Sequence, residues 1–303
     1  MRFICLLLLI SLSSCVTKDR PENLIEAQKV TSSKEPLPLL WTIERDGFPK
    51  SFLFGTIHLG VSFNELPELI SNSLKQSQQL ILEVDTINID PNELRKSTRL
   101  PKHQKLQDLI GDKYWQILLK KLPKHDPSQL SQLNPFAIFS LLQSQPHQGG
   151  ESMDRTIQSM GKKQNKSTIF LESVKFQLKT LNKIFTIATL KKSLKNNFDF
   201  TQSTENLRRL YLEGEEEKIQ EFIRTPQPGQ LQMSAEQIKL LLDDRNVTWA
   251  SILEPLLRRS PSFVAVGSGH LGGDKGLLKL LEKRGFIISR TQNDQDKGNS
   301  NEP

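Results

Sequence analysis

The chain has 303 residues, a formal net charge of +7 and an aromatic content of 7%. Its lysines are scattered and form no basic stripe interleaved with aromatic residues, which argues against a nucleic-acid partner. Both cysteines, Cys5 and Cys15, lie near the amino terminus, so the rest of the chain has no thiol for disulfide bonds, metal binding or nucleophilic catalysis.

The amino-terminal segment, residues 1–14, has the features of a secretory signal peptide. Arg2 precedes an apolar run from residue 6 to residue 12, which is shorter than the ~20 residues that span a bilayer. The Leu-Ser-Ser-Cys sequence that ends at Cys15 resembles the lipobox of bacterial lipoproteins, in which the cysteine is lipidated with fatty acids such as palmitate. We therefore expect lipidation at Cys15, and the alternative is an ordinary signal peptide with an incidental cysteine.

The mature chain is expected to have three parts. Residues 15–36 contain the lipidated cysteine and a polar tether, residues 37–290 form the folded domain, and residues 291–303 form a disordered polar tail. By resemblance to lipoprotein sorting, Val16 after the lipidated cysteine favours the outer membrane. The expected location is the bacterial cell envelope, with the protein held to the membrane by its lipid anchor and facing the periplasm.

The domain is predicted to begin with a hairpin and a crossover. Residues 40–44 and 51–54 flank an Asp-Gly dipeptide, which is a strong β-hairpin signal, and the second strand runs into the Gly-Thr-Ile-His sequence that ends at His58. Apolar residues at helical spacing follow between residues 66 and 74, and residues 80–85 then have the pattern of a buried strand. The order strand, helix, strand predicts a parallel crossover.

Glu83 is unusual within that buried strand. Its neighbours are apolar on both sides, and an ionised glutamate is rarely buried without a partner. A salt bridge or a metal ion would stabilise it, and Asp85, two positions later, is expected on the same face of the strand. The alternative for both residues is an ion pair at the strand end without a role in a site.

The middle of the domain, from residue 106 to residue 259, is predicted to be mainly helical. Residues 168–172 interrupt it with a short strand, and Glu172 at its end repeats the Leu-Glu ending of the strand before it. The alternative for Glu172 is a charge that stabilises the first turn of the next helix.

A second motif near the carboxyl terminus repeats the first. Residues 262–267 form an apolar run that ends in Gly-Ser-Gly-His-Leu-Gly around His270, much as the earlier run ends in Gly-Thr-Ile-His-Leu-Gly around His58. Each histidine is expected at the carboxyl end of a strand, where open α/β sheets bind their ligands. One histidine after a glycine is usually a loop residue, whereas a matched pair favours a site; an ancient repeat with only structural meaning is the alternative.

The chain resembles the TraB/PrgY/GumN family, which includes the Tiki proteins, from about residue 37 to residue 290. The resemblance is carried by Gly55 and His58, residues 82–85, Met153 and Asp154, Leu171, Glu172 and Gln177, Arg245 and Asn246, and residues 266–277. Methionine at position 153, where the family often has leucine, is the one departure.

The resemblance implies an α/β (α+β) fold, with a mixed central β-sheet, many flanking helices and two strand-Gly-x-x-His half motifs. It also implies a divalent-metal site formed by His58, His270 and Glu83 and, for some members, metal-dependent peptidase activity. Three protein ligands leave a position for water, whose pKa the metal lowers to ~7. Nitrogen and oxygen ligands do not distinguish manganese, zinc and cobalt.

The remaining candidates would assist that chemistry. Glu83 is interpreted as a ligand or general base, and Glu172 and Asp85 as groups that support the ligands or transfer protons. Arg245 and Asn246 would stabilise an oxyanion or bind a substrate carboxylate.

The predicted function is that of a metal-dependent hydrolase, a peptidase that acts on a peptide or protein substrate at the cell envelope. One alternative is a non-catalytic lipoprotein that binds or sequesters a peptide, haem, metal or other small ligand. A third reading is a structural lipoprotein in which the motif is idle.

Overall fold

The computed structural model describes residues 38–58, 60–144, 151–196, 198–225, 231 and 233–291. The predicted signal peptide, Cys15, the tether and the tail from residue 292 onward lie outside the described residues. No helix in the described ranges is both long and apolar enough to cross a membrane.

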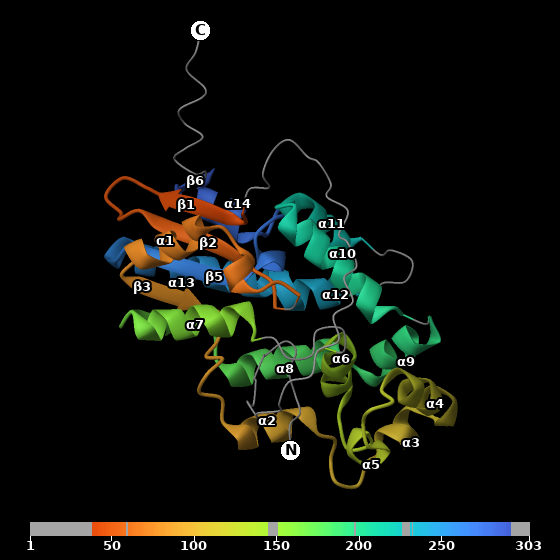
Figure 1. Ribbon diagram of the computed structural model, residues 1–303. Coiled ribbons are helices and arrows are strands. Elements are labelled where there is room, and N and C mark those ends of the chain that lie inside the picture. Colours follow the sequence, from red (N-terminus) through yellow and green to blue (C-terminus); the bar gives the residue numbers. More distant parts are fainter. Residues whose placement is uncertain are drawn as a thin grey trace, which may run out of the picture.

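A six-stranded mixed sheet forms the centre of the described structure (Figure 1). Its strands are β1 (Leu40–Glu44), β2 (Ser51–Thr56), β3 (Gln79–Leu82), β4 (Ser167–Phe170), β5 (Ser262–Gly267) and β6 (Ile287–Arg290). Their order is β4-β3-β5-β2-β1-β6; the first four are mutually parallel, and β1 is antiparallel to both of its neighbours. The predicted α/β fold, the first hairpin and the parallel crossover are thus confirmed.

The two repeated motifs lie on neighbouring strands at the middle of the sheet. Both β2 and β5 are buried along their whole length, as expected for apolar strands covered on both faces. They pair in parallel with Thr56 opposite Gly267, and β3 lies on the other side of β5 with Leu82 opposite Ala265. Three parallel strands therefore end at one edge, and the segments carrying His58, Glu83 and His270 leave from that edge.

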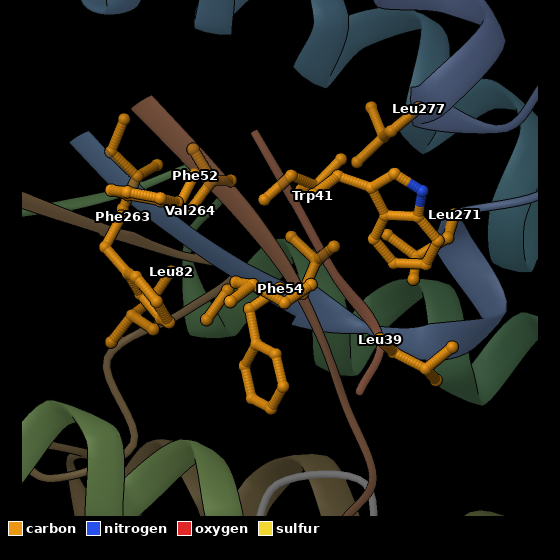
Figure 2. Packing of buried hydrophobic residues seen from close by; sticks show 14 of the residues in the cluster. Leu39, Trp41, Phe52, Phe54, Leu82, Phe263, Val264, Leu271 and Leu277 are labelled. Carbon is orange, nitrogen blue, oxygen red and sulfur yellow. The ribbon is translucent and has the colours of Figure 1, made fainter. Parts of the chain in front are cut away.

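Aromatic and aliphatic side chains from these strands form the core around the sheet (Figure 2). Phe54 of β2 packs against Phe263 of β5 with ring centroids 5.9 Å apart. Trp41 of β1 contacts the Arg290 guanidinium of β6, which lies 4.3 Å from its ring centroid. This packing fixes the strand ends that carry the polar residues.

Helices cover the sheet and extend to one side of it (Figure 1). They are α1 (Glu68–Gln76), α2 (Pro91–Thr98), α3 (Leu106–Ile110), α4 (Asp112–Lys121), α5 (Pro127–Leu130), α6 (Pro135–Ser144), α7 (Met153–Lys163), α8 (Val174–Ile184), α9 (Ile187–Lys195), α10 (Phe200–Leu212), α11 (Glu216–Arg224), α12 (Ala235–Ile238), α13 (Asp244–Arg259) and α14 (Leu277–Glu282), with the 3-10 turns η1 (Phe63–Glu65) and η4 (Ser268–His270) and the π-helical turn η3 (Lys239–Asp243). A second apolar cluster, with Trp115, Phe139 and Leu178 among its members, joins α4, α6 and α8.

Two predicted strands are shorter than the sequence indicates. The first ends at Leu82 and the second at Phe170, so Glu83 and Glu172 lie just beyond their strands. Strand-like pairing continues, however, because the Glu172 amide donates to the Glu83 carbonyl oxygen at 2.9 Å. The two acidic residues are thereby held side by side.

Candidate active site

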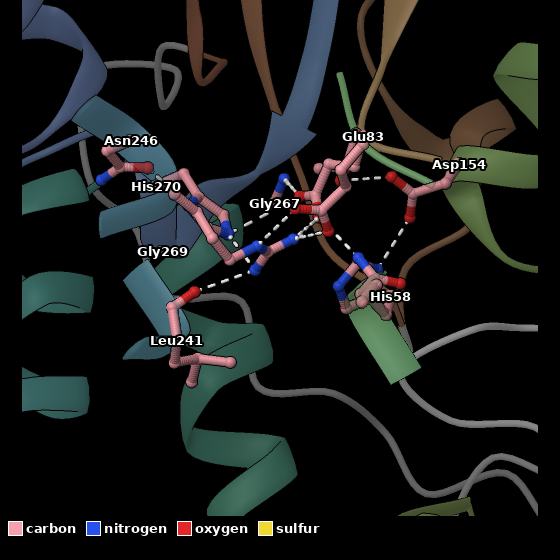
Figure 3. A network of polar contacts seen from close by, with 12 residues as sticks. His58, Glu83, Asp154, Leu241, Asn246, Gly267, Gly269 and His270 are labelled. Atoms are coloured by element: carbon pink, nitrogen blue, oxygen red, sulfur yellow. Dashed lines mark hydrogen bonds and ion pairs between the residues drawn. The ribbon is translucent and has the colours of Figure 1, made fainter. Parts of the chain in front are cut away.

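The polar residues predicted from the two motifs meet at the carboxyl ends of β2, β3 and β5 (Figure 3). His58 follows β2, Glu83 follows β3, and His270 lies in η4 directly after β5. The structure thus brings together the three predicted metal ligands, and Arg245 and Asn246 reach them from the start of α13.

Glu83 is a buried carboxylate with hydrogen bonds to both oxygens. Its Oε1 accepts from the Gly267 amide at 2.7 Å, and its Oε2 accepts from Gln177 Nε2 at 3.1 Å and Arg245 Nη2 at 2.8 Å. Burial alone would raise the pKa of Glu83, but the nearby His270, Arg245 and His58 outweigh it and lower this pKa to about 2. Glu83 is therefore ionised and able to act as a ligand.

His58 is oriented by Asp154, a residue on α7. Its Nδ1 lies 2.8 Å from Asp154 Oδ2, while Asp154 Oδ1 accepts from the Thr56 hydroxyl at 2.8 Å. Burial would lower the pKa of His58, but the charge and hydrogen bond of Asp154, with a contribution from Glu83, raise it to about 9. A Cβ added to Gly267 would lie 3.3 Å from Glu83 Oε1 and 3.7 Å from His58 Nε2, so both atoms border the same small space.

His270 is oriented in the same way by Asn246. Its Nδ1 lies 2.6 Å from Asn246 Oδ1, and its Nε2 lies 3.1 Å from Arg245 Nη1 and 3.8 Å from Glu83 Oε1. Its ring also packs against Trp249 at a centroid distance of 4.4 Å. Burial lowers the pKa of His270, and although Glu83 opposes this, the net pKa is about 3, so the ring is neutral.

Arg245 connects Glu172 to the site. Its Nε and Nη2 bind the two oxygens of Glu172 at 3.0 and 2.7 Å, in the bidentate geometry that arginine favours with carboxylates. Burial lowers the pKa of Arg245, but Glu83 and Glu172 raise it above its ordinary value. Burial raises the pKa of Glu172 despite this ion pair.

Asp85 does not lie at its predicted position beside Glu83. It was expected on the face of Glu83, but β3 ends at Leu82, so strand alternation does not continue to residue 85. Its carboxylate instead accepts from the Ile87 and Asn88 amides and from Gln158 Nε2, at 2.8–3.0 Å. The prediction that Asp85 supports this site was wrong.

Three residues that orient the site were not predicted from the sequence. Asp154 and Thr56 hold His58, and Gln177 of α8 holds Glu83. Asp154 and Gln177 belong to the positions that carry the family resemblance, and that was the one available signal. Both are buried, with exposed fractions of 9% and 5%.

The side chains at this site are of the chemical types that bind divalent metal ions. Each histidine has its Nδ1 fixed by an oxygen, which is the usual arrangement for an imidazole that binds metal through Nε2, and Glu83 supplies a carboxylate. Arg245, however, lies against His270 Nε2 and Glu83 Oε2. Within the residues that the structure describes, no three His, Cys, Asp or Glu side chains are placed to hold a metal ion.

A pocket of about 160 Å³, partly open to solvent, is lined by these groups. Its polar lining residues include His58, Glu83, Arg245 and His270. Its aliphatic lining residues are Ile57, Leu181, Leu207, Ile223, Leu241 and Leu242. The pocket therefore combines a few polar and charged groups with an apolar lining, as ligand sites commonly do.

The unfolding free energy of the metal-free protein is expected to fall as the pH rises from 6.5 through 9. The folded-state pKa of His58 is about 9 against 6.5 for a free histidine, so its stabilisation is complete below pH 6.5 and is lost above pH 9. We expect a loss of about 1–2 kcal/mol, because the side chain is 34% exposed and solvent screens the pair. Urea unfolding across this range, with Asp154→Asn as the control, measures the effect. An equal fall in both proteins would contradict this assignment.

Comparison with known proteins gives two matches. The model of the TraB/PrgY/gumN family matches residues 39–290. Metalloprotease TIKI2 from Danio rerio is 23% identical over 337 residues, covering 90% of this chain. The chain spans 65% of that relative's length. No solved structure matches the chain.

Proposed function

The chain belongs to the TraB/PrgY/gumN family, and from this premise we propose that it is a metal-dependent hydrolase that acts on peptides. The observation that carries the proposal is the convergence of His58, Glu83 and His270 at the ends of three parallel strands. The relative named a metalloprotease supports the same class of reaction.

In this proposal His58, His270 and Glu83 hold the ion. A bound divalent ion would polarise the scissile carbonyl group and lower the pKa of a water molecule to ~7. Asp154 and Asn246 each fix the Nδ1 of one histidine, so that Nε2 remains the donor atom. These two residues thus orient the ligands and do not bind substrate themselves.

The two glutamates have different roles in this proposal. The low pKa of Glu83 makes it a weak base and a good ligand, whereas burial raises the pKa of Glu172 above its ordinary value despite the neighbouring Arg245. Arg245 lies between them and supplies N–H donors to a developing oxyanion. We assign ligation to Glu83, and Glu172 holds Arg245 in place through both of its carboxylate oxygens.

Metal content tests this proposal directly. Purified chain incubated with manganese, zinc or cobalt is expected to retain about one ion, and His58→Ala and His270→Ala are each expected to retain less than about a tenth of that amount. His103→Ala, at an exposed position away from the site, is the matched control. Circular dichroism checks that the variants are folded. If the wild-type chain retains no ion, the hydrolase proposal fails.

A second candidate function is the binding of a peptide or other small ligand without catalysis. It is favoured by the aliphatic walls of the pocket and by the position of Arg245 among the would-be ligands. Ligand uptake that persists in Glu83→Gln, without hydrolysis in either protein, would support this function over the first.

We also propose that the chain is anchored at the cell envelope through lipid on Cys15. The support is the apolar run and the Leu-Ser-Ser-Cys sequence at the amino terminus. Radiolabelled palmitate is expected to label the wild-type chain in a bacterial host and not Cys15→Ala. An unlabelled wild-type chain would rule out the anchor.

A further inference from the structure

Arg245 hydrogen-bonds to His270 Nε2 and Glu83 Oε2, which belong to two of the proposed metal ligands. We propose that its guanidinium is a built-in competitor of the metal: it closes the site in the metal-free protein, and metal uptake displaces it from His270 and Glu83. This inference rests on the proposed metal site and concerns how that site is loaded.

The guanidinium has five N–H groups, and it makes five polar contacts in the structure. Two contacts go to Glu172 (3.0 and 2.7 Å) and one to the Leu241 carbonyl oxygen (2.8 Å). The other two go to Glu83 Oε2 (2.8 Å) and His270 Nε2 (3.1 Å). The side chain also lies over the Trp249 ring at 4.5 Å, so it is fully enclosed by partners.

Hydrogen-bond directions determine which nitrogen of His270 carries the proton. Asn246 Nδ2 donates to the Lys275 carbonyl oxygen at 2.8 Å, so Asn246 Oδ1 faces His270 and accepts the proton on Nδ1. Arginine has no acceptor, so His270 Nε2 must offer its lone pair to Arg245 Nη1. A metal ion would bind this same lone pair, and one lone pair cannot serve both.

The structure also provides a place for Arg245 after displacement. Glu172 is not one of the proposed ligands, so the guanidinium can move away from His270 and Glu83 together with the Glu172 carboxylate and keep that ion pair. Leu241 lies in the π-helical turn η3, and such turns occur frequently at functional sites. Glu172 is thus a positioning residue that retains the guanidinium beside the loaded site, where it can meet substrate.

The metal affinity of an Arg245 variant shows whether Arg245 competes with the metal ion or only supports the site. Titration of the full chain with Mn²⁺ and Zn²⁺, in competition with a fluorescent chelator, is expected to show at least tenfold tighter binding by Arg245→Met than by wild type. Arg258→Met is the matched control because it removes the same charge from an exposed position in the last turn of the same helix, α13. Its affinity is expected to stay within about threefold of wild type, since more distant charges interact weakly.

A second variant controls for misfolding caused by the loss of Arg245. Arg245→Met leaves two buried carboxylates without their cation, so Arg245→Met/Glu172→Gln is measured beside it, with circular dichroism for both. Trp249 gives an independent signal: metal addition is expected to change its fluorescence in wild type and much less in Arg245→Met, in which no guanidinium leaves the ring.

The outcomes distinguish the two proposals. Tighter binding in the Arg245 variants, or binding by them alone, supports competition. Binding by wild type that is equal to or tighter than that of the folded variants overturns the competition while leaving the metal site intact. Absence of binding in all folded proteins overturns the metal-dependent function itself, and the competition with it.

Discussion

Glu83→Gln is expected to lower kcat/KM for peptide hydrolysis by about a thousandfold. The change retains the shape of the side chain but replaces an anionic ligand with a neutral amide, and loss of the several kcal/mol of charge stabilisation that the ion supplies corresponds to about this factor. It also removes the charge that Arg245 Nη2 binds at 2.8 Å, so the guanidinium loses one of its two carboxylate partners. The measurement is steady-state hydrolysis of a peptide that the wild-type chain cleaves.

Glu68→Gln is the matched control for this variant. Glu68 is an exposed residue in the first turn of α1, and its replacement is expected to leave kcat/KM within about twofold of wild type. Turnover retained by Glu83→Gln would remove Glu83 from the mechanism. Metal analysis of the same preparations shows whether a loss of turnover follows the loss of the ion.

Gly276→Ala is expected to lower the unfolding free energy by about 3 kcal/mol, the upper end of what overpacking costs. A Cβ on Gly276 would overlap the carbonyl oxygens of Leu271 and Gly272, which are backbone atoms that cannot rotate away. The same loop supplies the Lys275 carbonyl that holds Asn246, which in turn orients His270. The variant should therefore bind metal more weakly as well as unfold more easily.

Gly111→Ala separates steric overlap from backbone strain. Gly111 has φ +85° and ψ 155° and no atom within 4 Å of an added Cβ, so its replacement costs only the backbone strain, about 2 kcal/mol. Urea unfolding of both variants gives the comparison. If the two variants lose the same free energy, overlap at Gly276 is not the cause.

The sheet edge that carries the site could be predicted because its signals are local. An apolar run that ends in Gly-x-x-His predicts a strand followed by a histidine, and two such strands in parallel place both histidines at one edge. Glu83 could be identified for a similar reason, since it is a charge next to an apolar run. The resulting set of His58, Glu83 and His270 lies together in the structure.

The supporting residues could not be predicted because their contacts join residues that are far apart in the sequence. Asp154 reaches His58 from α7, and Gln177 reaches Glu83 from α8, and no local pattern marks either contact. Asp85 was misplaced because strand alternation was extended beyond the true end of β3. Arg245 was predicted to contact substrate, and only its geometry reveals that it binds Glu83 and His270.

The antiparallel pairing of β1 with β6 brings the two ends of the described domain together. The Thr291 amide donates to the Leu40 carbonyl oxygen at 2.9 Å, and Arg290 Nε donates to the Pro38 carbonyl oxygen at 2.8 Å. The domain is therefore suited to circular permutation, with a short linker joining these ends and new termini at the turn around Gly47. Such a rearranged chain would keep β2, β3 and β5 in their places, and with them the complete set of polar groups at their carboxyl ends.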